Sequence, residues 1–147
     1  MIERMIIFNK GGLPLYTRKF VESGSMEPSL LAGLVSAIDS MGFTLFKKKI
    51  ATISFGEENF SSLNENVSKI VFISKDIMRL DKNFYFVFFC NGNDSLKLLR
   101  QISTRVFIEI KSILQSDMPD SARITELTNK IINNHFAHIG KGDYNDD

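Results

Sequence analysis

The chain has 147 residues, a net charge of +1 at neutral pH and a single cysteine. This is the length of one ordinary domain, and it allows a core that needs no disulfide or metal for its stability. The balanced charge excludes a global field that attracts nucleic acid, and one cysteine excludes a disulfide within the chain. We expect a globular protein in a reducing, cytoplasmic compartment.

Five short runs of β-branched and aromatic residues predict strands. They are residues 4–8, 15–20, 49–55, 70–73 and 84–89. Gly11-Gly12 between the first two runs predicts a tight hairpin, because glycine tolerates positive φ. Pro14 places the second run at a sheet edge, since proline cannot donate a ladder hydrogen bond, and the third run is polar enough for the other edge. The fifth run is apolar at every position, which predicts a strand covered on both faces.

Three segments have apolar residues at helical spacing. The first begins at Pro28, which suits the first turn of a helix, and ends between residues 42 and 46. We expect its apolar stripe to pack on the sheet; the stripe comprises Leu30, Leu31, Leu34, Val35, Ile38, Met41 and Leu45. The other two helices follow residues 93–94 and 117–120. Residues 56–66 and 75–83 are polar and predict a loop and a surface turn.

This order of elements predicts an α+β fold in one domain over residues 1–139, followed by a flexible acidic tail over residues 140–147. The first, fourth and fifth strands are apolar enough to be central, and the second and third are the edges. One helix should cover one face of the sheet and two helices the other. No stretch reaches 18 consecutive apolar residues, so we expect no transmembrane segment.

Two pieces of sequence resemble the longin domain family of membrane-trafficking proteins. MIIFNKGGLPLYTRKF (residues 5–20) is similar to the first longin hairpin, and SLLAGLVSAIDSMG (residues 29–42) is similar to the first longin helix. The likeness extends over roughly residues 2–138. It implies a longin/profilin-like, mainly antiparallel sheet of five strands in the order 2-1-5-4-3, which agrees with the edges inferred from polarity.

The resemblance also implies a function. Longin domains are non-catalytic interaction platforms that pair with another longin or a roadblock subunit and engage small Ras-like GTPases. We therefore expect an adaptor or scaffold in membrane trafficking or its regulation, forming a homodimer or such a pair, without a cofactor. The alternative from another class is a small-molecule-sensing regulatory domain, with a pocket beneath a helix.

The first helix supplies the candidate interface. Its less apolar side carries small, uncharged residues, where a surface helix normally carries Lys and Glu. These residues are Ser29, Ala32, Gly33, Ser36 and Ser40. A partner helix could approach this side closely, and the neighbouring edge strand, with Ile50, Thr52 and Ser54, could extend a sheet into the partner. The alternative is that this side is merely solvated or covered by the chain's own loop.

Other motifs give weaker signals. Lys47, Lys48 and Lys49 protect an edge strand from aggregation or make a weak peripheral contact with an anionic surface. His135 and His138 lack further ligands, so we expect no metal site. Cys90 is expected to be a buried hydrophobe, and no phosphate-binding glycine motif is present.

Overall fold

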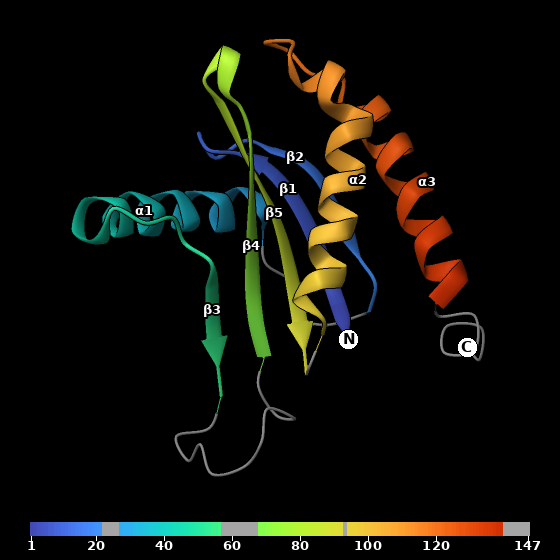
Figure 1. Cartoon of the computed structure of the whole chain (residues 1–147), viewed down its shortest axis with the longest axis horizontal. Helices are drawn as coiled ribbons and strands as arrows, with labels where there is room; N and C mark the ends of the chain where they lie inside the picture. Colours follow the sequence, from blue (N-terminus) through green and yellow to red (C-terminus); the bar gives the residue numbers. More distant parts are fainter. Residues whose placement is uncertain (22–26, 57–67, 93, 140–147) are drawn as a thin grey trace. The chain divides into compact units, whose positions relative to one another are not determined.

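The computed structural model describes residues 1–21, 27–56, 68–92 and 94–139, the last four of these by their backbone alone (Figure 1). The chain folds as two compact units, Met1–Leu96 and Lys97–Asp147. The elements of the first unit are β1 (Ile2–Asn9), β2 (Pro14–Lys19), α1 (Pro28–Phe46), β3 (Thr52–Phe55), β4 (Ser68–Ile77), the 3-10 turn η2 (Met78–Leu80) and β5 (Lys82–Asn91). The second unit holds the helices α2 (Leu96–Leu114), which begins at the boundary, and α3 (Ser121–Ile139).

The five strands form one antiparallel sheet in the order β2-β1-β5-β4-β3. This confirms the predicted α+β class and the predicted strand order, with β2 and β3 at the edges. The single-domain boundary at residue 139 and the placement of the last two helices on the other face stay predictions. The predicted loop at residues 56–66, apart from Gly56, and the predicted tail at residues 140–147 lie outside the described residues.

The centre of the sheet is β5, which pairs with β1 on one side and β4 on the other. Its residues 84–88 are all buried, as the uninterrupted apolar run predicts. Gly12 closes the β1–β2 hairpin with a φ of +95°, a conformation that residues with a side chain rarely adopt.

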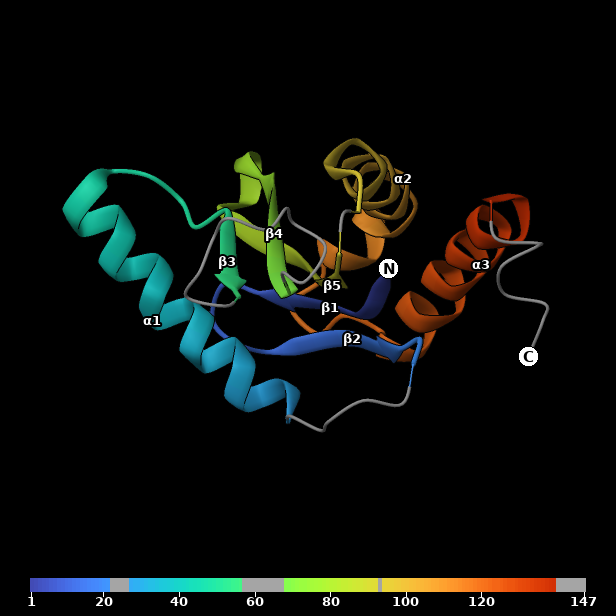
Figure 2. The same cartoon turned by 90° about the horizontal axis from the view of Figure 1, so that it is seen from below.

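Helix α1 lies on one face of the sheet and runs across the strands (Figures 1 and 2). It packs through three apolar residues, Leu31, Ala32 and Val35. The sheet side of this layer consists of Ile6, Phe8, Phe72, Tyr85 and Val87, with Ile50, Ile53, Ile70 and Phe89 partly buried around it. The Tyr85 ring lies 5.8 Å from the ring of Phe8 and 6.2 Å from that of Phe72, within the range of aromatic pairs.

The predicted surface turn at residues 75–83 is shorter in the structure. Strand β4 continues to Ile77, which pairs with Lys82 of β5, and the turn itself is η2. The strand tolerates its charged residues because Asp76 forms an ion pair with Lys49 at 3.0 Å, while Ile77 is buried. Alternating charge therefore did not mark a loop here.

Helices α2 and α3 are amphipathic. Every third or fourth residue of α2 is buried, from Leu99 to Leu114, and the Ser103 hydroxyl donates to the Leu99 carbonyl at 2.8 Å. Among residues 121–135 of α3, whose side chains are described, the buried positions are Ile124, Thr128 and Ile132. This spacing agrees with the helical periodicity of the sequence.

Candidate protein-interaction surface

Helix α1 is rotated about its axis relative to the orientation that its apolar stripe predicts. The buried positions are Leu31, Ala32, Val35 and Asp39. Four residues of the predicted stripe are instead exposed, namely Leu30, Leu34, Met41 and Leu45. At about 100° per residue, the two faces differ by roughly a quarter turn. The prediction that the whole stripe packs on the sheet was wrong.

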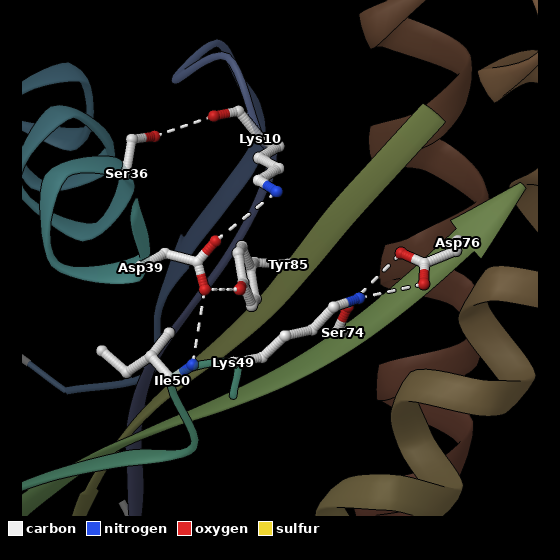
Figure 3. A network of polar contacts seen from close by, with 8 residues as sticks. All are labelled: Lys10, Ser36, Asp39, Lys49, Ile50, Ser74, Asp76 and Tyr85. Atoms are coloured by element: carbon white, nitrogen blue, oxygen red, sulfur yellow. Dashed lines mark hydrogen bonds and ion pairs between the residues drawn. The ribbon is translucent and has the colours of Figure 1, made fainter. Parts of the chain in front are cut away.

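Asp39 gives the physical reason for this rotation. It is the one charged residue of α1, yet its side chain is only 2% exposed. A buried carboxylate requires hydrogen-bond partners, and the structure provides them from three segments (Figure 3). Asp39 accepts from the Tyr85 hydroxyl on β5 and from the Ile50 amide at 3.3 Å, and its other oxygen lies 3.8 Å from the Lys10 ammonium group.

The same network joins α1 to the β1–β2 hairpin and to β4. The Ser36 hydroxyl donates to the Lys10 carbonyl at 2.8 Å. The Lys49 ammonium donates to Ser74 and to Asp76, both at 3.0 Å, which attaches the segment after α1 to β4 (Figure 3). These contacts fix the position of α1 on the sheet.

Tyr85 is the neutral partner of this network. Burial raises the pKa of the Tyr85 hydroxyl well above its ordinary value, and the hydrogen bond to Asp39 and the negative charge of that carboxylate raise it further. The hydroxyl therefore stays protonated and donates to Asp39 over the physiological pH range. Neither residue was singled out in the sequence, although a lone Asp in an apolar helix and a Tyr in an all-apolar strand are the signals that could have found the pair.

The sheet-facing side of α1 is longer than the sheet beneath it. Phe43 and Phe46 lie four and seven residues after Asp39, so helical geometry places them on the side that is buried earlier in the helix. Both are nevertheless exposed, Phe43 by 54% and Phe46 by 68%. Figures 1 and 2 show the cause: the C-terminal end of α1 continues past β3, where the sheet ends. We call this C-terminal end of α1, which carries Phe43 and Phe46, the overhang of α1.

Strand β3 is the edge of the sheet that the overhang passes. The Phe72 amide donates to the Ala51 carbonyl at 2.9 Å, and Ile53 pairs with Ile70. In an antiparallel ladder, the residues between these hydrogen-bonded pairs direct their backbone groups to the other side. Thr52 and Ser54 therefore present their N–H and C=O groups to the outer edge of β3, with which no strand of the described chain pairs.

The predicted interface residues fall into separate environments. Ser29, Gly33 and Ser40 are exposed, and a Cβ added at Gly33 would meet no atom within 4 Å. Ala32 is fully buried against the sheet, so its placement on the open side was wrong. Their interface role stays a prediction for the exposed three.

The remaining predicted interface residues have structural partners or face the edge. Ser36 is half-buried and bonded to the hairpin, and the Ile50 amide is bonded to Asp39. Thr52 and Ser54 lie at the edge of β3 as the sequence predicts. The sequence reasoning missed Phe43 and Phe46, because it did not anticipate that the helix would extend beyond the sheet.

The lysine run follows the overhang directly. Lys47 ends α1 in the left-handed conformation (φ 57°), with its amide bonded to the Phe43 carbonyl, and its ammonium group lies 5.6 Å from the Phe43 ring centroid. Lys49 is paired with Asp76, and Lys47 and Lys48 are exposed. The contact of these lysines with an anionic surface stays a prediction.

Cys90 and the acidic residues form no further site in the part of the chain that is described. Cys90 is buried, and this burial, together with the negative charge of Asp94, raises the pKa of its thiol to about 12. Such a thiol carries almost no thiolate at neutral pH, so it is a poor nucleophile. Among the described residues, no three His, Cys, Asp or Glu side chains are grouped so that they could hold a metal ion.

By length and composition alone, α1 is apolar enough to cross a membrane. This property was not evident from uninterrupted apolar runs, because Asp39 and several small polar residues interrupt the apolar sequence of the helix. Core helices of soluble proteins and signal sequences pass the same test, so composition is weak evidence of a span. In the structure α1 lies on the sheet, and its carboxylate Asp39 is bonded to Tyr85.

Comparison with known proteins assigns this chain to no family. No protein-family model matches the sequence, and the search of curated proteins finds no match. A solved structure that is similar in fold is the gliding protein MglB from Thermus thermophilus, with a TM-score of 0.46 and 11% sequence identity over 71% of each chain. A likeness of this size carries no information about function.

Proposed function

We propose that this protein is a non-catalytic interaction module that pairs by extending its sheet across the edge of β3. The partner is a second copy of the chain or another longin or roadblock subunit, and the pair engages a small Ras-like GTPase. The observation that carries the proposal is the overhang: the sheet-facing side of α1 continues through Phe43 and Phe46 beyond the last strand. Added strands of a partner would complete the layer beneath it.

A second copy of the chain can supply the missing strands beneath the overhang through a two-fold symmetric pair. When two β3 strands pair antiparallel about a two-fold axis normal to the sheet, both copies of α1 lie on the same face of the combined sheet. Each overhang then covers the sheet of the other copy. The contact would bury the exposed Phe43 and Phe46 side chains, and the outward groups of Thr52 and Ser54 would gain hydrogen bonds.

The GTPase part of the proposal rests on the resemblance to the longin family rather than on a described side chain. A pair with a continuous sheet offers a larger rigid surface than one chain, and standard protein complexes bury about 800 Å² on each partner. Pairing is therefore the first step to test, and binding of a GTPase the second.

Sedimentation velocity over a range of protein concentrations tests the pairing. We expect the wild-type chain to associate, and the double variant Phe43→Gln/Phe46→Gln to remain monomeric because two apolar anchors are lost. A second variant, Ser54→Pro, blocks the outward N–H of β3 without removing a hydrogen bond to β4. The matched control Ile108→Gln/Met118→Gln changes two exposed apolar residues on the second unit and should associate like the wild type.

Affinity capture from the native cell extract then tests the partner class. A longin, a roadblock subunit or a Ras-like GTPase recovered with the wild type and lost with Phe43→Gln/Phe46→Gln would support the proposal. A chain that stays monomeric, and whose captured proteins are the same for the wild type and the variant, would refute a role of this surface in pairing.

A further inference from the structure

The outward side of α1, away from the sheet, carries a narrow apolar stripe. Its residues are Leu30, Leu34, Met41 and Leu45, which are 50–65% exposed. At about 100° per residue, these positions fall within an arc of about 60°. The stripe extends over most of the 19-residue helix, so it is a long, straight apolar surface distinct from the underside of the overhang, where Phe43 and Phe46 lie.

The exposed charges that follow this stripe are positive, whereas the exposed Glu27 precedes it at the N-terminus of the helix. Between Pro28 and Ile50 every exposed charged side chain is a lysine, because the one acidic residue, Asp39, is buried and bonded to Tyr85. Lys49 is compensated by Asp76 at 3.0 Å. Among the residues that the structure describes, Lys47 and Lys48 form no ion pair, so they add positive charge at the C-terminal end of the helix.

We propose that the outward stripe of α1 and the Lys47-Lys48 turn bind the surface of an anionic lipid bilayer, with the helix lying in the plane of the interface. Interfacial helices of this kind combine an apolar face with lysines at its border. Neither signal suffices alone: three lysines without an apolar contact bind weakly, and an apolar stripe without charge has no preference for anionic lipid. The structure places the two lysines in the turn that directly follows the last residue of the stripe, Leu45.

The charge pattern favours this occupant over a partner helix. Helix pairs in water usually flank their apolar seam with charges of both signs, which select the partner. Within α1 no exposed charged residue lies beside this stripe, and the exposed charges lie beyond its two ends, with Glu27 before it and Lys47 and Lys48 after it. The proposal does not depend on pairing. If the chain pairs through β3, the two-fold axis places two such stripes on the same side, so one bilayer could contact both and the affinity would rise.

A tryptophan reporter tests the contact directly, because the chain contains no Trp. Met41→Trp places the probe in the stripe, and Met118→Trp places it at an exposed methionine of the second unit. Vesicles of phosphatidylcholine with about 30% phosphatidylserine, matching the anionic character of a cytoplasmic leaflet, are compared with pure phosphatidylcholine vesicles. We expect a blue shift of the Met41→Trp emission and its quenching by brominated lipid, and no change for Met118→Trp.

Vesicle flotation then measures how much the lysines and the apolar stripe each contribute to the affinity for anionic vesicles. Lys47→Gln/Lys48→Gln should weaken binding to the anionic vesicles about 25-fold, at about fivefold for each lysine. Leu30→Gln/Leu34→Gln should weaken it at least about tenfold, because two exposed apolar side chains are lost from the contact. The control Lys97→Gln/Lys130→Gln has the same net charge as the lysine variant and should bind like the wild type.

Three results would overturn the proposal. The first is a Met41→Trp emission that does not respond to anionic vesicles at low salt. The second is a control variant, Lys97→Gln/Lys130→Gln, that binds as weakly as Lys47→Gln/Lys48→Gln. This would show that binding depends on the net charge of the chain and not on the position of the lysines. The third is a Leu30→Gln/Leu34→Gln variant that floats like the wild type but no longer self-associates, which would assign the stripe to a second copy of the chain.

Discussion

The contact between Asp39 and Tyr85 is expected to be a strong stabilising interaction of the first unit. Both residues are 2% exposed, and the Tyr85 hydroxyl donates to the Asp39 carboxylate. A hydrogen bond to a charged group contributes about 1.5–3 kcal/mol. Tyr85→Phe should therefore lower the free energy of unfolding by about this amount, since it removes the hydroxyl and little else.

Asp39→Ala should cost more, because two donors lose their acceptor. The Tyr85 hydroxyl and the Ile50 amide would both be left in or near the core, and an unsatisfied buried group costs about 1–3 kcal/mol. The Ile50 amide is only part-buried, so its loss lies near about 1 kcal/mol, and the two losses together amount to roughly 2–4 kcal/mol. A typical domain has a stability of about 5–15 kcal/mol, so the variant should still fold.

A double-mutant cycle isolates the pairwise energy. Urea unfolding followed by far-ultraviolet circular dichroism, for the wild type, the two single variants and the double variant, should give a coupling of about 1.5–3 kcal/mol. The comparison cycle on the more exposed ion pair of Lys49 and Asp76 should give about 0.2–1 kcal/mol. A coupling below about 0.5 kcal/mol between Asp39 and Tyr85 would refute the view that this contact fixes α1 on the sheet.

Three further perturbations test other parts of the structure. In a tyrosinate titration followed at 295 nm, Tyr85 should ionise above the ordinary tyrosine pKa of about 10. Its contribution to stability is therefore complete below that pH and is lost as the pH rises through the raised pKa. Tyr85→Phe should remove the tyrosine ionisation that occurs at the highest pH, and a titration curve that keeps this step in the variant would contradict the assignment. The thiol of Cys90 has a pKa of about 12, against 9.0 for an exposed thiol, so far less of it is thiolate at pH 8. It should therefore react with iodoacetamide about 1,000-fold more slowly in the folded chain than in urea. Equal rates in the two states would show that the thiol is accessible in the folded chain. Phe86→Ala, at a fully buried position of β5, should lower the free energy of unfolding by about 3–5 kcal/mol in a urea titration, whereas Phe55→Ala on the exposed edge should cost less than about 1 kcal/mol; similar losses would contradict the burial pattern.

The strand order could be predicted from the sequence because it follows from polarity. The all-apolar run that became β5 had to be covered on both faces, and Pro14 excluded β2 from the centre. Gly12 predicted the turn of the first hairpin, because glycine readily adopts the positive φ that this turn requires. Each of these signals is local and has one structural solution, so no knowledge of the remaining chain was needed.

The orientation of α1 could not be predicted because it depends on distant partners. Apolarity alone favours a face that includes Leu30, Leu34 and Met41, and a lone Asp on a helix is normally placed in water. The cost of burying Asp39 is offset by Tyr85, Ile50 and Lys10, which come from three other segments. The overhang is equally a property of the assembled layer, since helix length and sheet width are set by separate parts of the sequence.

The measurement that tests the sheet-extension proposal most directly is amide hydrogen exchange at β3, followed residue by residue by NMR. The account predicts that the amides of Thr52 and Ser54 exchange rapidly in dilute protein and become at least about tenfold slower as the concentration rises into the range of association. The amide of Ile53, which faces Ile70, should be protected throughout and serves as the internal control. In Phe43→Gln/Phe46→Gln the two outer amides should stay fast at every concentration. Wild-type amides of Thr52 and Ser54 that exchange equally fast in dilute and concentrated solution, although the protein has associated, would contradict pairing through this edge.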